Sequence, residues 1–101
     1  MNTITQPGVY TYIDPHSGGT RYAFIAKPPV RAASARAVCT APTRHVRIPL
    51  TDIRHNAYPQ LSPRAAARKW LRATKFLRGC YDESPAVRRS MTAIRQLARD
   101  Q

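Results

Sequence analysis

The sequence of 101 residues predicts a single α+β domain, in which a small antiparallel sheet of about three strands packs on one amphipathic helix and a C-terminal helix follows. Three observations support this class. Two short alternating runs in the first third of the chain are separated by turn-forming residues. Two Ser-Pro pairs each precede an apolar pattern with helical spacing. The hydrophobic content of 43% is ordinary for a folded protein. Strands and a basic loop are expected over 8–50, and helices over 62–78 and 85–99.

The N-terminal part is expected to form a β-hairpin. GVYTYI (8–13) alternates and is rich in strand-forming residues, and TRYAFIA (20–26) is a second such run. DPHSGG (14–19) contains Asp, Pro, Ser and two glycines and predicts the turn between them. Tyr22 and Phe24 share one face of the second run, which is the face expected to pack in the core.

The basic segment KPPVRAASARAVCTAPTR (27–44) is expected to be a surface loop or an extended arm. Part of it, from Ala37 to Thr40, could pair with the hairpin, and the alternative is a flexible arm that orders on its partner. HVRIPL (45–50) alternates and predicts a third strand, with Arg47 pointing away from the apolar face. Pro49 has no backbone donor, so this strand is expected at an edge of the sheet. TDIRHNAYPQL (51–61) is expected to connect it to the first helix.

Both helices have clear N-terminal signals, because Ser is a good N-cap and Pro is favoured at the first helical position. The first is expected to end near Gly79. Its apolar positions are Ala67, Trp70, Leu71, Thr74 and Leu77. Those of the second are Val87, Met91, Ile94 and either Leu97 or Ala98. Trp70 is expected to pack against the sheet.

Positive charge dominates the composition. Lys and Arg number 17 against 5 Asp and Glu, which gives a net charge of +12. Fourteen of the basic residues are Arg, whose guanidinium binds phosphate through a planar fork. Residues 21–81 contain thirteen basic residues and a single acid, Asp52. Repulsion among so many positive charges lowers the stability of the fold unless a polyanion offsets it, so the composition favours a nucleic-acid partner.

The first helix also carries a motif. In AARKWLRA (66–73), an Ala-Ala-Arg, an aromatic residue two positions later and an Arg-Ala follow one another, and Leu-Arg-Gly closes the helix at 77–79. With Gly-Val-Tyr at 8–10 and Ala23 and Ile25 in the second strand, this pattern resembles the ethylene-response-factor type of DNA-binding domain of plants, which has relatives in phage and bacterial integrases. The chain departs from the family at Leu71, where Asp is usual, and in the long segment 27–44.

The resemblance implies that a three-stranded sheet lies in the major groove of duplex DNA, with the helix packed behind it. Arg21, Arg44 and Arg47 would then contact bases and phosphates. If the first helix binds the nucleic acid instead, the surface that follows the phosphate backbone is the row of basic residues on its exposed face. This row consists of Arg64, Arg68, Arg72 and Lys75. The complete set of candidate nucleic-acid-binding residues is Arg21, Lys27, Arg31, Arg36, Arg44, Arg47, Arg64, Arg68, Arg72 and Lys75.

The sequence does not predict catalysis, a cofactor or a metal ion. Gly8-Val9-Tyr10 is similar to the start of the GIY-YIG nuclease motif, but its second half is absent, and five acids leave little for two-metal chemistry. The spacing of Cys39, His45, His55 and Cys80 matches no compact zinc motif. A structural disulfide is not expected in a chain without a secretion signal, and a cytosolic location is the default.

Two alternatives stay open. A small basic protein of a phage or plasmid could instead inhibit a host protein or nucleoprotein, as anti-CRISPR-like inhibitors do, with Tyr10, Tyr12, Tyr58 or Tyr81 as apolar anchors. The second helix could then form a homodimer or partner surface through Met91 and Ile94. RNA is the other alternative, with Tyr22 and Phe24 stacking on bases. No stretch is long and apolar enough to span a membrane, so no membrane partner is expected.

Overall fold

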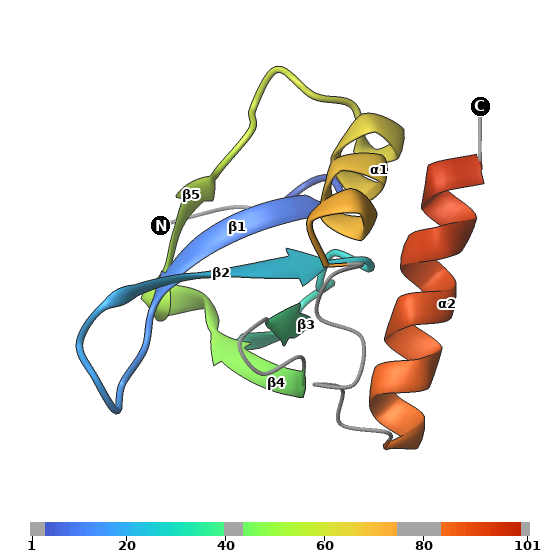
Figure 1. The fold of residues 1–101 in the computed structure, drawn as a ribbon. Coiled ribbons are helices and arrows are strands. Elements are labelled where there is room, and N and C mark those ends of the chain that lie inside the picture. Colours follow the sequence, from blue (N-terminus) through green and yellow to red (C-terminus); the bar gives the residue numbers. More distant parts are fainter. Residues whose placement is uncertain (1–3, 40–43, 75–83, 100–101) are drawn as a thin grey trace.

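The computed structural model shows a five-stranded antiparallel sheet with two helices on one side of it (Figure 1). The structure describes residues 4–39, 44–74 and 84–99. The strands are β1 (Gly8–Ile13), β2 (Thr20–Ile25), β3 (Ser34–Cys39), β4 (Arg44–Pro49) and β5 (Ile53–Asn56). The helices are α1 (Pro63–Thr74) and α2 (Pro85–Arg99), and a short 3-10 helix, η1 (Leu50–Asp52), joins β4 to β5. The α+β class is confirmed, but the sheet has five strands instead of about three.

The strand order is β4-β3-β2-β1-β5, so four consecutive strands form a meander and β5 returns to pair with the free edge of β1. The predicted hairpin is confirmed, with Val9 opposite Phe24 and Tyr12 opposite Arg21. In its turn, the backbone N–H of Gly18 donates to the carbonyl of Asp14 at 2.7 Å, and Gly18 has a φ of 74° that glycine tolerates without strain. As expected, β4 with its terminal proline lies at an edge.

The two additional strands lie in residues 27–44 and 51–61. They extend the partial pairing expected in the first segment and correct the expectation for the second. The first segment contains β3, a strand inside the sheet that pairs with β2 and along its whole length with β4. The segment is therefore neither a loop throughout nor a free arm. The expectation that part of it pairs with the hairpin is confirmed, because Val38 and Cys39 pair with Phe24 and Ala23 of β2. The second segment contains β5, whose Ile53 is fully buried and pairs with Tyr12. β5 forms because the outer edge of β1 would otherwise present unpaired backbone groups.

The face of the sheet that turns away from the helices is buried by the sheet itself. One cluster of buried side chains draws on all five strands and on Ile4 near the N-terminus. Its larger members are Tyr10, Tyr12, Ile25, Ile48 and Ile53, and the small residues of β3 fill the space between them. The two edge strands contribute to the same cluster, so the sheet is strongly curved around it. This inner face is therefore a core and not an open binding surface.

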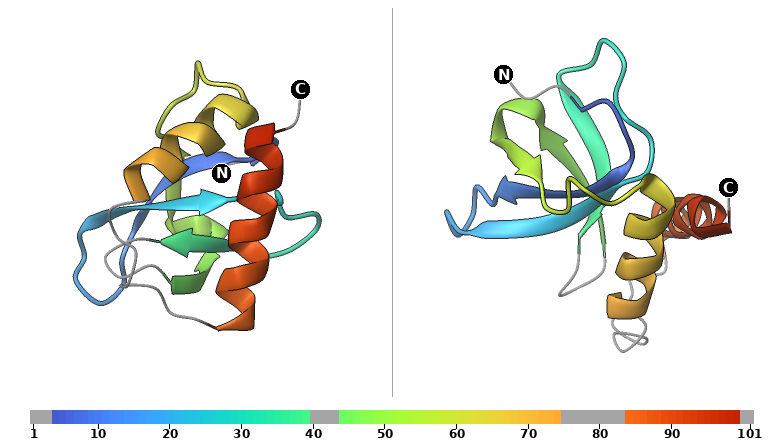
Figure 2. Two further views of the ribbon diagram at one scale, coloured as in Figure 1. Left: turned by 45° about the vertical axis from the view of Figure 1, so that its right-hand side comes forward. Right: turned by 90° about the horizontal axis from the view of Figure 1, so that it is seen from above.

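The opposite face of the sheet forms a second core with the helices (Figure 2). Phe24 and Val38 point toward the helices and are 1% and 0% exposed. The ring of Phe24 lies 6.0 Å from the ring of Trp70, centroid to centroid, at an angle of 52°. Such tilted aromatic pairs add to the stabilisation from buried area. The expected place of Trp70 in the core is confirmed.

Both predicted helix starts are confirmed. The Ser62 hydroxyl accepts a hydrogen bond from the N–H of Ala65 at 3.1 Å, and the Ser84 hydroxyl accepts one from the N–H of Val87 at 3.3 Å. The expected end of the first helix at 75–79 lies outside the described residues. The apolar stripe of α2, which we expected could form a dimer surface, is buried within the chain at Val87, Met91 and Ile94. Neither described helix is long and apolar enough to cross a membrane.

Candidate nucleic-acid interface

Two arginines lie opposite each other on the helix-facing side of the sheet. In the register of β3 and β4, Arg36 pairs with Arg47 and Val38 pairs with His45. Val38 belongs to the core beneath the helices. Because side chains alternate between the two faces of a strand, Arg36, Arg47 and His45 lie on the same face as Val38. Both arginines are exposed, and His45 is partly buried.

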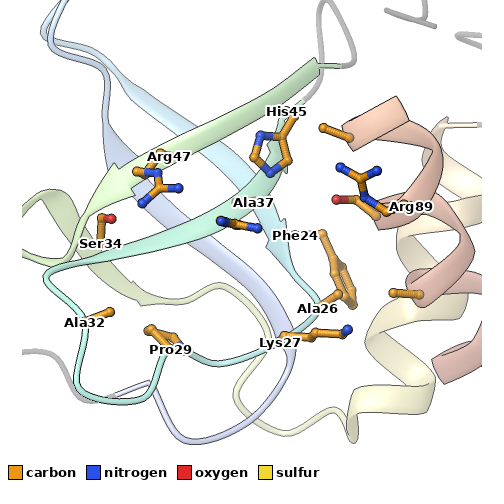
Figure 3. Close-up of a pocket in the computed structure, with 14 residues that line it drawn as sticks. Phe24, Ala26, Lys27, Pro29, Ala32, Ser34, Ala37, His45, Arg47 and Arg89 are labelled. Atoms are coloured by element: carbon orange, nitrogen blue, oxygen red, sulfur yellow. The ribbon is translucent and has the colours of Figure 1, made fainter. Parts of the chain in front are cut away.

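A cleft of about 430 Å³ lies between these two strands, the loop after β2, and α2. Figure 3 shows Arg47 and His45 projecting from β4 and Arg89 projecting from α2 toward the same space, with Lys27 at its margin. None of the described lining residues is acidic. They are Phe24, Ala26, Lys27, Pro29, Ala32, Ser34, Arg36, Ala37, His45, Arg47, Ala86, Arg89, Ser90 and Ala93.

The four full positive charges of the cleft have no counter-charge within the described part of the chain. Lys27, Arg36, Arg47 and Arg89 make no hydrogen bond or ion pair with any described residue. Arg21 differs, because its guanidinium donates to the carboxylate of Asp14 at 3.0 Å. Like charges directly opposite in a sheet destabilise it. The cleft therefore concentrates positive potential at a cost to the fold, which an anion would offset.

His45 responds to this potential. Its burial, followed by the charges of Arg36, Arg47 and Arg89, lowers the pKa of His45 below 6.5. The neutral imidazole is therefore favoured in the folded protein. An anion in the cleft acts in the opposite direction, because it offsets the repulsion and so raises the pKa of His45.

We expect an NMR titration to show this coupling. The unfolded chain takes up its proton near pH 6.5, so the contribution of His45 to the free energy of unfolding falls as pH drops below 6.5 and levels off below the folded-state pKa. Arg47→Ala should raise the pKa of His45, as should added duplex DNA. Arg99→Ala, at the far end of α2, should leave it unchanged. If neither Arg47→Ala nor added DNA changes the pKa of His45, the cleft holds no anion near this ring.

The cleft continues as a groove along α2. A neighbouring hollow shares Ala26, Lys27, Arg89 and Ala93 with it and extends along the helix as far as Leu97. From Ala86 to Leu97 the helix rises about 16 Å, at about 1.5 Å per residue. One strand of B-form DNA carries a phosphate every ~3.4 Å of helix axis, so this length corresponds to about five nucleotides.

The strand arginines implied by the family resemblance do not share one surface. Arg21 lies opposite Tyr12, and Arg44 lies opposite Cys39, so both are on the inner face of the sheet. Arg47 is on the helix-facing side, away from the apolar inner face as expected. The inner face is closed by its own core, so these residues cannot act together on a flat exposed sheet. The resemblance to the family itself stays a prediction.

The basic row of the first helix is also not one free surface. The Nε of Arg68 donates to the carbonyl of Ala98 at 3.0 Å and so joins α1 to the end of α2. Arg64 is partly buried, and Arg72 is exposed beside a different hollow. Lys75 lies outside the described residues. Arg31 is exposed in the loop after β2, where its φ of 53° is in the left-handed region, and it does not line the cleft.

Two of the tyrosines proposed as anchors for a protein partner are in the inner core. Tyr10 is 6% exposed and donates its hydroxyl to the carbonyl of Gln6 at 2.8 Å. Tyr12 is 5% exposed, and burial and the neighbouring Cys39 raise its pKa to about 12. Tyr58 is partly buried, and Tyr81 lies outside the described residues. The expectation that Tyr10 and Tyr12 are exposed anchors is therefore wrong.

The structure adds Arg89 and His45 to the residues predicted from sequence. The basic residues expected from sequence do not include Arg89, although Ala86, Arg89, Ser90 and Ala93 repeat at helical spacing and form a face of mostly small residues. In the sequence, the only ligand that His45 suggests is a metal ion, and its spacing from the other candidate ligands matches no compact zinc motif. Within the described ranges, no group of three or more His, Cys, Asp or Glu residues could hold a metal ion. Lys27, Arg36 and Arg47 are the predicted residues that the structure brings together.

In comparisons with known proteins, no family model, no curated protein and no solved structure matches this chain.

Proposed function

We propose that the protein binds nucleic acid without catalysis, and that the cleft between β3, β4 and α2 holds phosphates of the backbone. The supporting observation is that Lys27, Arg36, Arg47 and Arg89 surround one cleft without a counter-charge among the described residues. A protein that needed these charges only for solubility would distribute them and mix their signs. The cleft collects them from a loop, two strands and a helix.

The chemistry of the cleft suits phosphate. Arginine binds phosphate oxygens through two parallel N–H donors, and such charge-assisted bonds are stronger than neutral ones. The groove along α2 also has the length to follow several phosphates. None of the described lining residues is a carboxylate, the usual protein ligand of Mg²⁺, so the proposal assigns attachment and not hydrolysis. Duplex DNA is the first ligand to test, because the sequence favoured it.

The direct test is fluorescence anisotropy of labelled duplex DNA between about 50 and 200 mM salt. Affinity should fall steeply with salt. Arg47→Ala should weaken binding about tenfold, since it removes one charge-assisted contact, and should reduce the log–log salt slope by about 1. Arg54→Ala is the matched control: it removes the same charge from an exposed position on β5, the strand at the opposite edge of the sheet from β4, and should have little effect.

Equal losses in the two variants would assign binding to overall charge and not to the cleft. If no nucleic acid binds at physiological salt, the proposal fails and the protein-binding alternative takes its place. One observation favours a site for that alternative: Val30, in the loop beside the cleft, is 83% exposed. An exposed aliphatic side chain next to a charged cleft is a suitable anchor for a protein partner.

A further inference from the structure

A second hollow, of about 550 Å³, lies between α1 and the strands β1 and β2. None of the described residues that line it also lines the cleft. Three of its seven described lining residues are aromatic, two are basic and none is acidic. They are Val9, Tyr22, Tyr58, Lys69, Trp70, Arg72 and Ala73. Aromatic rings beside cations are the elements that single-stranded nucleic-acid sites use to stack bases and hold the backbone.

The aromatic side chains of this hollow include one fixed ring and one exposed ring. Trp70 is 6% exposed and packs against Phe24 from behind. Its buried Nε1 donor has no partner among the described residues, although buried indole donors are usually paired. Tyr22 follows the same face of β2 as Phe24 but is 50% exposed, so the expectation that both rings pack in the core is confirmed for Phe24 and wrong for Tyr22. The core thus uses Phe24 and leaves the ring of Tyr22 free to contact a ligand.

The rim of the hollow is positively charged. The Nζ of Lys69 lies 4.9 Å from the centroid of the Tyr58 ring, a distance typical of a cation–π contact. The backbone N–H of Tyr58 donates to the side chain of Asn56 at 2.9 Å, which holds the loop before α1 in place. Arg72 is exposed on the same rim. The hollow therefore suits a planar ring attached to an anionic chain.

We propose that this hollow binds an unpaired base of a nucleic-acid strand, with the base stacked on Tyr22 and the adjoining phosphates near Lys69 and Arg72. The proposal rests on the proposed function in that the partner is again nucleic acid, but it uses different residues and a different chemistry. Bases inside a duplex are stacked on each other and cannot enter. The preferred ligand is thus a duplex that continues into a single strand.

The experiment compares three labelled DNA probes: a blunt duplex, the same duplex with a short thymine overhang, and the same duplex with an overhang of abasic sites. The thymine overhang should bind about five- to tenfold more tightly than the blunt duplex, in line with stacking on one exposed ring. The abasic overhang carries the same phosphates and should give no such gain. Trp70 is the only tryptophan, so thymine should also quench the protein's tryptophan fluorescence.

Variants separate this site from the cleft. Tyr22→Ala should abolish the gain from the thymine overhang and leave binding of the blunt duplex unchanged, whereas Tyr22→Phe keeps the ring and should keep the gain. Arg47→Ala should weaken the binding of all three probes by the same factor. If the overhang gives no gain, or if Tyr22→Ala preserves it, the inference is overturned while the proposed function stands. If the fluorescence of Trp70 changes with an acidic tyrosine-containing peptide and with no oligonucleotide, the hollow binds a protein side chain and the inference is overturned.

Discussion

Replacing Arg47 with Glu is expected to weaken binding of duplex DNA by about 10- to 100-fold and, at the same time, to raise the thermal stability of the protein. The loss of affinity follows from the loss of a charge-assisted contact, which contributes about 1.5–3 kcal/mol. The carboxylate also repels the phosphates. The gain in stability follows from the register, because Arg47 lies directly opposite Arg36. A like-charged pair becomes an opposite-charged pair, a change of about 0.5–1 kcal/mol.

The opposite signs of the two effects make this variant informative. A stability gain of that size should raise the midpoint of thermal unfolding by about 2–6 °C in a domain of this length. Calorimetry and anisotropy on the same sample measure both effects. Arg54→Glu, with the same charge change on β5 at the opposite edge of the sheet, should alter affinity much less. If affinity and stability both fall, the loss of binding is a consequence of unfolding, and the cleft loses its support as the site.

The elements that could be predicted from sequence are those with local signals. The hairpin has its alternation and a turn of Asp, Pro and Gly, and the structure confirms both strands. The helix starts at Ser62 and Ser84 depend on a side chain that caps its own helix, so nothing distant is needed to recognise them. The spacing of Trp70 and of the apolar residues of α2 likewise shows which side of each helix is buried.

The strand predicted only in part, β3, and the strand not predicted, β5, depend on neighbours that are distant in sequence. In β3, SARAVC, the alternation is present, but Ala is a poor strand former and the arginines suggest a solvated loop. It becomes a strand because β2 and β4 pair with it on both sides. β5 has only four residues, and of these only Ile53 is buried. Four residues are too few to show a strand periodicity. β5 forms because it pairs with the free edge of β1.

The candidate site was predictable only as a list of basic residues. Arg21, Arg44 and Arg47 are all in strands, and the strand register decides which face each one occupies. A shift of one residue would exchange the faces. Arg89 joins Arg47 because α2 packs across β3 and β4, a tertiary contact with no local signal. The sequence showed that basic residues are abundant. The packing of α2 against the sheet determines which of them line one cleft.

Phe24→Ala is expected to lower the free energy of unfolding by about 3–5 kcal/mol, the cost usual for removing a buried aromatic ring. Phe24 is 1% exposed, packs against Trp70 and lines the base of the cleft. Domains of this size are stable by about 5–15 kcal/mol in total, so the variant should be largely destabilised. Urea denaturation followed by circular dichroism measures this change.

Tyr22→Ala is the control for that measurement, because it removes a ring of similar size from the same face of the same strand, two residues away. Tyr22 is 50% exposed, so its loss should cost well under about 1 kcal/mol, as is usual for surface positions. Phe24→Leu, which keeps most of the volume, should fall between the two. A contrast of this size supports the division that underlies both proposals: Phe24 holds the helices on the sheet, and Tyr22 is left for a ligand. Equal costs at the two positions would mean that Tyr22 is also part of the core, and would remove the exposed ring on which stacking depends.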